Sequence, residues 1–257
     1  MASKSNIVQV DKLSYEGYGF ILCYPKPSPE EFSRRVLELK SLGVEALDFS
    51  GGKQVYGFQV LGKGTSAIIL KALKDGKPYA LKVRRMDSGK PNMRHEAELT
   101  RAANKVGVGP TLYASTENML LMELVEGANF TEWLLRLNES EKGRLTLSTL
   151  IRRLLEHCRR LDEAGIDHGE LSRASKHIIV RGNLDPCILD FEKASLKRRV
   201  ANVTSIVQFL FIKGKLAEKV QRILGEKDRS LLIGYLKRYK ESLSGEDFRE
   251  MLSFLLG

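Results

Sequence analysis

The sequence predicts a two-lobed α+β protein, because a β-rich half is followed by an α-rich half. From Val55 to Val83 the hydrophobic residues alternate as in strands, and Gly76 marks the turn of a hairpin. Beyond Gly127 the pattern is mostly helical, with short strands expected around His177–Val180 and Cys187–Leu189. A chain of 257 residues is long enough for two lobes with a ligand-binding cleft between them.

The first residues differ in pattern from the rest of the chain. We therefore divide it into an N-terminal extension (residues 1–58), a β-rich lobe (residues 59–126) and an α-rich lobe (residues 127–257). In the extension, the aromatic-rich segment Tyr15–Tyr24 is predicted to form a strand. A helix should then begin with Ser28 as its N-cap, Pro29 in the first position and Glu31 closing a capping box. Gly43 should end this helix, which we expect to pack on the next domain rather than to bind DNA.

The remaining elements of the β-rich lobe are predicted from periodicity. A helix is predicted over about Asn92–Val106, and a pair of strands within Thr111–Val125. The lobe is therefore expected to carry one helix beside its strands.

The charge balance indicates which classes of partner to expect. The chain has 42 Lys and Arg against 32 Asp and Glu, a formal net charge of +10. Such an excess fits a polyanionic partner such as nucleotide phosphates, RNA or a ribonucleoprotein, or else a solvated basic surface. The three cysteines show no metal-binding spacing, and no apolar run is long enough for a membrane span. We therefore expect a cytoplasmic protein without a membrane partner.

A glycine-containing segment lies at the junction of two predicted strands. Glycines allow a backbone to approach phosphates closely, and free N–H groups there can hold anionic oxygens. A hairpin turn that happens to contain glycine is the alternative interpretation. The candidate nucleotide-binding residues of this loop are Gly62, Lys63, Gly64, Thr65 and Ser66.

Lys82 is the first candidate for phosphate binding outside that loop. On its predicted strand it shares a face with Ala80, which leaves room for a nucleotide above it. On the following helix Glu98 falls on a charged, solvent-facing stripe, whereas Glu96 falls on the less polar face. An inward carboxylate requires a cation, so we expect Glu96 to pair with Lys82.

Two carboxylates in the α-rich half complete the candidate site. Glu170 comes after a predicted helix end and short strand, where a carboxylate can accept the proton of a substrate hydroxyl. Asp190 ends an apolar strand, a position suited to holding Mg²⁺ against phosphate oxygens. Glu192 points to the same side and is expected to be a second metal ligand or a salt-bridge partner of Lys193.

The order of these motifs resembles the protein-kinase superfamily, and the chain is most similar to small atypical archaeal kinases such as the RIO kinases and the kinase subunit of the KEOPS complex. The resemblance covers about Val55 to Gly225. Its most specific segments are Arg94-His95-Glu96-Ala97, Gly107-Val108-Gly109-Pro110, Met122-Glu123-Leu124-Val125-Glu126-Gly127, Ala164-Gly165-Ile166-Asp167-His168-Gly169 and Ile188-Leu189-Asp190-Phe191.

The resemblance implies a bilobal protein-kinase-like fold that binds ATP and Mg²⁺. Lys82 and Glu96 would orient the phosphates, and the backbone at Glu123 and Leu124 would form the hinge that binds adenine. Asp190 would bind Mg²⁺, and Glu170 would be the catalytic base.

The chain departs from the kinase pattern at four positions. Glu170 replaces the catalytic Asp, and the glycine expected after Asp190-Phe191 is missing. Ser175 stands where a metal-binding Asn is expected, unless the loop is longer and Lys176 or His177 takes that place. Asn202 stands where an Asp usually braces the catalytic loop.

The expected function is an atypical serine/threonine protein kinase that transfers the γ-phosphate of ATP to a protein hydroxyl, its own included. The alternatives are a pseudokinase or ATPase-type module in a ribonucleoprotein or tRNA-modification complex, and a small-molecule phosphotransferase. The segment between Glu192 and Asn202 is short for an activation segment, which favours one dedicated protein or macromolecular substrate. The basic run Lys197-Arg198-Arg199 is a candidate contact for an acidic or RNA partner, or a solvated cluster.

Overall fold

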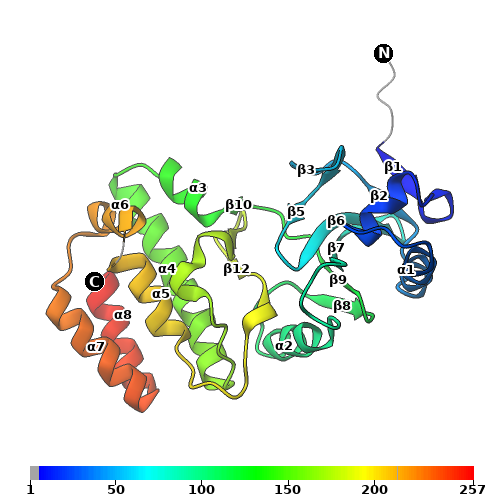
Figure 1. The fold of residues 1–257 in the computed structure, drawn as a ribbon. Coiled ribbons are helices and arrows are strands. Elements are labelled where there is room, and N and C mark those ends of the chain that lie inside the picture. The colour runs from blue at the N-terminus through cyan, green and yellow to red at the C-terminus, as the bar shows by residue number, and fades with distance from the viewer. Residues whose placement is uncertain (1–5, 213) are drawn as a thin grey trace. The chain divides into compact units, whose positions relative to one another are not determined.

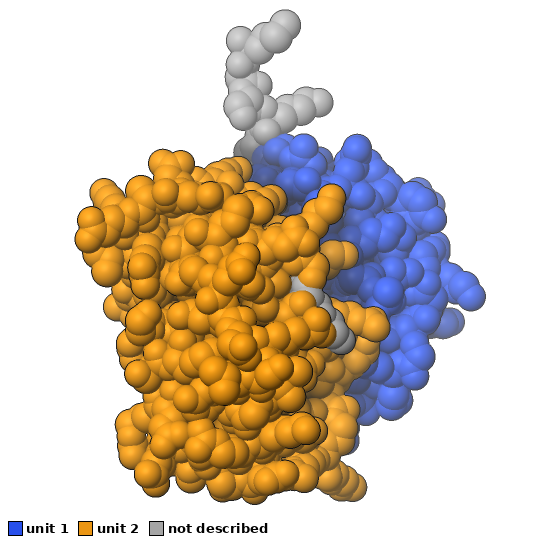
Figure 2. Space-filling model, turned by 90° about the vertical axis from the view of Figure 1, so that its left-hand side faces the viewer, with its two compact units in different colours: residues 1–101, 110–124 blue, residues 102–109, 125–257 orange. Residues whose placement is uncertain are grey.

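Antiparallel sheets and helices make up the chain in a computed structural model that describes residues 6–212 and 214–257 (Figure 1). The predicted α+β class is confirmed. The chain divides into two compact units, coloured separately in Figure 2. Unit 1 consists of residues 1–101 and 110–124, and unit 2 of residues 102–109 and 125–257.

Unit 1 is built on a seven-stranded sheet with the order β1-β2-β6-β7-β9-β8, in which β5 also pairs with β6. These strands are β1 (Ile7–Gln9), β2 (Ala46–Asp48), β5 (Gly62–Lys63), β6 (Ala67–Lys74), β7 (Lys77–Arg84), β8 (Leu112–Ser115) and β9 (Met119–Glu123). β3 (Lys53–Val55) and β4 (Phe58–Val60) form a separate hairpin. The predicted hairpin turn joins β6 to β7, with positive φ at both Asp75 (50°) and Gly76 (67°), as a type I′ turn requires.

The first 58 residues contribute strands β1 and β2 to this sheet, together with helices η1 (Val10–Lys12), η2 (Tyr18–Cys23) and α1 (Pro29–Ser41). The strand predicted over Tyr15–Tyr24 is wrong. Ile21, Leu22 and Cys23 are buried in succession, and consecutive inward side chains suit a tight helical turn rather than an alternating strand. The predicted N-cap is confirmed, since the Ser28 hydroxyl accepts from the Glu31 N–H at 3.3 Å.

Each face of the large sheet has its own apolar packing. Leu81 and Val83 of β7 lie in one core with buried residues of the first 50 positions. Leu120 of β9 packs in a second cluster with Met93 and with Ala97 of α2 (Arg94–Lys105). Because side chains alternate along β7, Lys82 lies on the opposite face from Leu81 and Val83.

The fully buried Arg35 attaches α1 to the sheet. Its guanidinium donates to the Leu22 carbonyl, to the Arg84 carbonyl at 2.6 Å and to the Glu31 carboxylate at 2.7 Å. A buried guanidinium with this many acceptors is satisfied, so we assign Arg35 a structural role.

Unit 2 is mainly helical. It contains α3 (Phe130–Arg136), α4 (Glu141–Glu163), α5 (Asn202–Phe211), α6 (Gly214–Leu224), α7 (Arg229–Ser242) and α8 (Gly245–Leu256). Helix α4 packs against α5, α6 and α8 (Figure 1). Within the part of the chain that the structure describes, no helix is long and apolar enough to cross a membrane.

A small antiparallel sheet lies in unit 2, with β10 (Ala128–Asn129), β11 (Ile178–Val180) and β12 (Pro186–Ile188) in that order. The short strands expected near His177 and Cys187 are therefore confirmed, and they pair with Ile178 opposite Ile188. The 3₁₀ turn η3 (Leu171–Lys176) precedes β11, and η4 (Phe191–Lys193) comes after β12. This arrangement brings the segments around Glu170 and Asp190 together.

Candidate functional site

The predicted pair of Lys82 and Glu96 is present in unit 1. Lys82 Nζ lies 2.5 Å from Glu96 Oε1, and the two side chains are only 7% and 4% exposed. Glu98, on the other side of α2, is exposed. The periodicity of the helix was therefore sufficient to choose between the two glutamates.

A second lysine, which the sequence did not indicate, also approaches Glu96. Lys90 Nζ lies 3.6 Å from Glu96 Oε2, so each carboxylate oxygen faces an ammonium group. Lys90 stands in the loop before α2, where no periodicity shows which way a side chain points. Two lysines on one buried carboxylate make this a locally positive site.

The glycine loop joins β5 to β6. Gly62 and Lys63 are strand residues paired with Ile69 and Ile68. The Gly64 N–H donates to the Ala67 carbonyl at 2.8 Å. This amide is therefore engaged within the turn, contrary to the expectation that it is free for phosphate.

Arg85 holds the same loop from the end of β7. Its guanidinium donates to the Gly64 carbonyl at 2.8 Å, and its own N–H donates to the Ser66 carbonyl at 2.8 Å. Thr65 is exposed, whereas Ser66 is half-buried. A loop fixed in this way keeps its shape, with Lys63, Gly64 and Thr65 exposed.

The predicted hinge lies where the chain passes from unit 1 to unit 2. Glu123 is the last residue of β9, and its N–H donates to the Thr111 carbonyl at 2.8 Å. The Glu123 carboxylate also accepts from the Thr111 N–H at 3.2 Å. Leu124 comes next as a half-buried residue, the last of unit 1.

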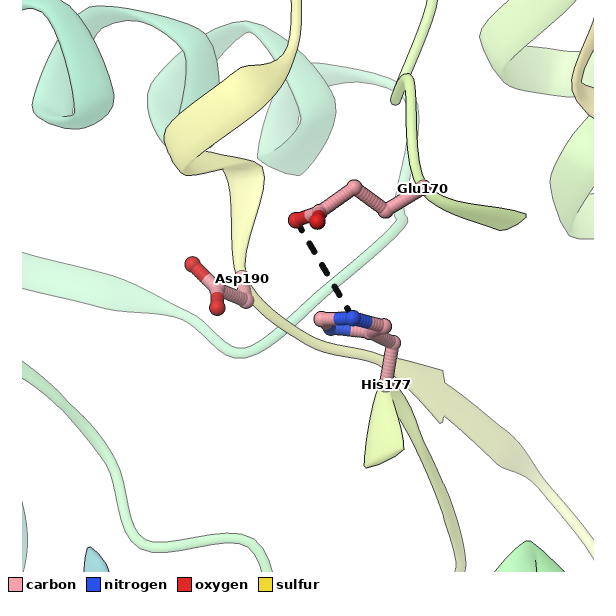
Figure 3. Close-up of side chains that lie close together, drawn as sticks. All are labelled: Glu170, His177 and Asp190. Carbon is pink, nitrogen blue, oxygen red and sulfur yellow. Dashed lines mark ion pairs between the residues drawn. The ribbon is translucent and has the colours of Figure 1, made fainter. Parts of the chain in front are cut away.

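In unit 2 the structure brings Glu170 and Asp190 together with His177 (Figure 3). One ligand atom from each residue lies within 4.8 Å of the others, and all three residues are half-buried. Glu170 precedes η3, His177 comes directly after it, and Asp190 lies beyond β12. We call these three residues the unit 2 carboxylate–imidazole group. Two carboxylates and one imidazole are ligands that a divalent cation accepts.

The predicted metal ligand Ser175 lies inside η3. Its carbonyl oxygen accepts from Asn129 Nδ2 at 2.9 Å. His177, one of the two alternatives left open by the sequence, is the residue that meets Glu170 and Asp190.

Lys193 forms an ion pair that the sequence assigned to a different carboxylate. Its Nζ lies 2.8 Å from Glu170 Oε1, whereas Glu192 was expected to be either its salt-bridge partner or a second metal ligand. The hydrogen bond from Lys193 to Glu170 raises the pKa of Lys193. The other carboxylate oxygen of Glu170, Oε2, lies 4.0 Å from His177 Nε2 (Figure 3). Glu170 is therefore placed between an ammonium group and an imidazole.

A buried amide braces the loop that carries Glu170. Asn202 Oδ1 accepts from the His168 N–H at 2.9 Å, and Asn202 Nδ2 donates to the Ile166 carbonyl at 2.6 Å. Asn202 Nδ2 also donates to Asp162 Oδ1 at 2.7 Å. Asn202, expected to replace a bracing Asp, therefore braces the loop itself.

Asp162 supplies the negative charge behind this brace, and the sequence did not single it out. It is 3% exposed at the end of α4, and its second oxygen accepts from the Tyr239 hydroxyl at 3.1 Å. Burial raises the pKa of Asp162. The available signal was its place beside the apolar stripe of α4, four residues after the buried Cys158.

His168 lies beneath the same loop and is fully buried. Its Nε2 lies 3.0 Å from the Leu189 carbonyl oxygen, and its ring meets Phe191 edge-on at 5.0 Å between centroids. Burial lowers the pKa of His168. His168 thereby connects the segment before Glu170 to the segment that carries Asp190.

Position 169, directly after His168, requires glycine. Gly169 has φ of 83°, and a Cβ there would lie 2.9 Å from the Lys193 carbonyl oxygen. Arg198 packs against the same position and donates to Asp167 Oδ2 at 2.8 Å. Of the predicted basic run, Arg198 is thus used internally, Arg199 donates to the Lys240 carbonyl, and Lys197 is exposed.

Comparisons with known proteins assign no family. No sequence model of a protein family matches the chain. An uncharacterized protein of Methanocaldococcus jannaschii, MJ1211, is 26% identical over 122 residues, which are 47% of this chain and 99% of that protein. The name of that relative states no activity.

Proposed function

We propose that this protein is an ATP-dependent phosphotransferase of the atypical serine/threonine protein-kinase type, with the bilobal fold of that superfamily. The buried ion pair of Lys82 and Glu96 carries the proposal. Burying two charges costs several kcal/mol per ion, and well-packed apolar residues would stabilise a sheet at least as well. A buried lysine fixed by a carboxylate is instead suited to holding a phosphate, because the carboxylate keeps its ammonium group in place.

The unit 2 carboxylate–imidazole group supports the second requirement of phosphoryl transfer, a divalent cation. Its donor set fits such an ion, with Asp190 as an oxygen ligand, His177 as a nitrogen ligand and the negative charge of Glu170 beside them. When bound, the ion would neutralise charge on the phosphate oxygens. Asp190 has a left-handed backbone (φ 70°), a conformation that is often found at functional sites.

Glu170 is the proposed base. Its carboxylate would accept the proton of the substrate hydroxyl as the hydroxyl oxygen bonds to the γ-phosphorus and the bond to the β-phosphate oxygen breaks, releasing ADP. Lys193, at 2.8 Å from Oε1, would hold the carboxylate with Oε2 directed away from the ammonium group. A residue in this role contributes about 10²- to 10⁴-fold to the rate.

The ion pair between Lys193 and Glu170 favours a second candidate function. The Lys193 ammonium group already occupies Oε1 of Glu170, which leaves fewer positions on this carboxylate for a substrate hydroxyl. A pseudokinase that binds nucleotide without transferring phosphate is consistent with that pairing and with the engaged Gly64 amide.

Transfer of label from [γ-³²P]ATP separates the two functions. Wild type, Glu170→Gln and Asp190→Ala are incubated with a panel of protein substrates and alone, with Glu98→Gln as a matched control on the exposed face of α2. We expect label transfer by wild type and the control, and at least about 100-fold less from the other two variants. Equal transfer by all four proteins would refute the enzymatic proposal.

Nucleotide binding is measured on the same four proteins. Binding by wild type without transfer would favour the pseudokinase. ATP turnover that rises only with added small alcohols or sugars would instead support a small-molecule phosphotransferase.

A further inference from the structure

The unit 2 carboxylate–imidazole group is not an all-oxygen site. Its three candidate donors are a carboxylate oxygen of Glu170, a carboxylate oxygen of Asp190 and a ring nitrogen of His177, within 4.8 Å of one another (Figure 3). Mg²⁺ prefers oxygen ligands in near-ideal octahedral geometry. Imidazole nitrogen instead favours first-row transition-metal ions.

His177 is fixed in this position by the main chain. Its N–H donates to the Ala174 carbonyl at 2.9 Å, and its own carbonyl accepts from the Leu189 N–H at 2.8 Å. The second bond joins His177 directly to the residue before Asp190. The backbone segments that carry the imidazole and the Asp190 carboxylate are therefore joined at the end of the paired strands β11 and β12.

Glu170 is oriented by a partner outside the group. Lys193 Nζ binds Oε1 at 2.8 Å, and Oε2 is the oxygen near His177 Nε2, at 4.0 Å. Hydrogen bonds from outside the ligand set orient metal ligands in this way and are important for metal affinity. The side chains of Glu170 and His177 are 23% and 16% exposed, which leaves coordination positions open to water or phosphate.

A second imidazole, that of His168, lies close to the group. The His168 ring lies 5.8 Å from the His177 ring, centroid to centroid, and among the described residues His168 Nδ1 has no hydrogen-bond partner. Buried polar atoms in native proteins generally have a hydrogen-bond partner in the protein or in ordered water. This nitrogen is therefore a candidate partner for a water molecule near the group.

We propose that this group binds Mn²⁺ in preference to Mg²⁺, and that His177 is the ligand that sets the preference. The role of the ion in catalysis rests on the proposed function, but its binding requires no ATP. Carboxylates suit both Mn²⁺ and Mg²⁺. Mn²⁺, as a first-row transition-metal ion, also accepts an imidazole nitrogen, whereas Mg²⁺ is a hard cation that takes oxygen ligands.

Metal binding to the chelator-treated full chain tests the proposal directly. Calorimetric titrations with MnCl₂ alone and MgCl₂ alone should give one site, with Mn²⁺ bound at least about tenfold more tightly. Pulsed EPR of the Mn²⁺ complex should show coupling to an imidazole ¹⁴N nucleus. Equal affinity for the two ions, or a spectrum without nitrogen coupling, would overturn the proposal.

His177→Asn identifies the ligand, with His95→Asn on α2 as the matched control. His177→Asn should lose the nitrogen coupling, weaken Mn²⁺ binding at least about tenfold and bring the two affinities close together, whereas the control should keep all three properties. Circular dichroism confirms that each variant is folded, and Asp190→Asn serves as a second test should His177→Asn unfold. Unchanged Mn²⁺ affinity and coupling in His177→Asn would refute the assignment.

The outcomes distinguish this proposal from the proposed function. Mn²⁺ binding with nitrogen coupling but no label transfer from ATP would leave the metal site standing and remove the kinase. Label transfer supported by Mg²⁺ without any preference for Mn²⁺ would support the kinase and refute the proposed metal preference.

Discussion

The two charged sites of the chain differ in how they are enclosed. In unit 1, Lys82 and Glu96 are almost fully buried and lie on a long strand and the first turn of a helix. In unit 2, Glu170, His177 and Asp190 are half-buried and lie on turns that flank short strands. The first site is a fixed pair of opposite charges, and the second is a group of ligand atoms partly exposed to solvent.

Because of this difference, the two sites should contribute differently to the free energy of unfolding. Charges out of water interact strongly and are expensive when one partner is lost, whereas exposed pairs are screened and contribute little. Mutations in unit 1 should therefore affect stability and activity together. Mutations in the unit 2 group should affect function with little effect on stability.

The largest effect is expected for Lys82→Met. Removing the ammonium group leaves the Glu96 carboxylate buried, with Lys90 no closer than 3.6 Å. We expect a loss of about 3–5 kcal/mol in the free energy of unfolding, measured by urea denaturation, and loss of ATP-dependent label transfer. Lys71→Met is the matched control, because Lys71 pairs with Asp48 in the same sheet and is 28% exposed, so its loss should cost no more than about 1 kcal/mol.

The double variant Lys82→Met/Glu96→Leu removes both charges. It should regain most of the stability lost in Lys82→Met, because no buried charge of the pair remains unpaired, but not the activity. Recovery of label transfer in the double variant would show that the pair is only structural.

Asn202→Asp tests the brace beneath the unit 2 loop. A carboxylate at this position would face Asp162 Oδ1 in place of the amide that donates to it at 2.7 Å. We expect a loss of about 3 kcal/mol at pH 7, because two buried carboxylates repel. The repulsion raises the pKa of the pair above its unfolded value, so the lost stability should return as the pH falls through that raised pKa. Urea denaturation at pH 7 and pH 5 measures this, and equal losses at both would contradict the account.

The half-buried His157 gives a smaller, pH-dependent effect. Burial lowers its pKa from 6.5 to about 4, with Arg160 adding to the shift and Asp185 opposing it. The unfolded state therefore binds more protons than the folded state, so stability should fall as the pH drops from about 6.5 towards 4. By pH 5 this histidine should contribute a loss of about 2 kcal/mol.

The contribution of His157 is measured as the difference in the free energy of unfolding between wild type and His157→Gln across that pH range. Burial also raises the pKa of Asp162, which favours the folded state at low pH in both proteins and so cancels in the difference. A difference that is constant between pH 7 and pH 5 would contradict the assignment.

The smallest effect on stability is expected for Lys193→Met. Lys193 is 64% exposed and its ion pair with Glu170 is screened by water, so the urea midpoint should not change measurably. Label transfer should nevertheless change, since the orientation of Glu170 is lost. A marked loss of stability would show that the group in unit 2 is as rigid as the pair in unit 1.

The sequence predicted the features that depend on regular periodicity. The α1 cap at Ser28, the Asp75-Gly76 hairpin and the choice of Glu96 over Glu98 all arise from local patterns, and each is confirmed. Glu96 could be predicted from the sequence because helix geometry alone places it on the inward face.

The features that the sequence could not predict depend on irregular segments and distant contacts. Lys90 lies in a loop, where residue spacing does not determine which atoms meet. The sequence named His177 only as an alternative to Ser175, because the length of the loop before it could not be fixed. Asp162 and Asn202 are 40 positions apart, so their pairing could not be read from either helix. The engaged Gly64 amide results from the turn geometry rather than from the presence of glycine.

Calorimetric binding of ATP to wild type and to Lys82→Met/Glu96→Leu, with Mn²⁺ or Mg²⁺ present, tests the central claim most directly. If the buried pair exists to hold phosphate, wild type should bind ATP and the folded double variant should bind it at least about tenfold more weakly. Equal affinity of the two folded proteins, or no binding by wild type, would contradict the account.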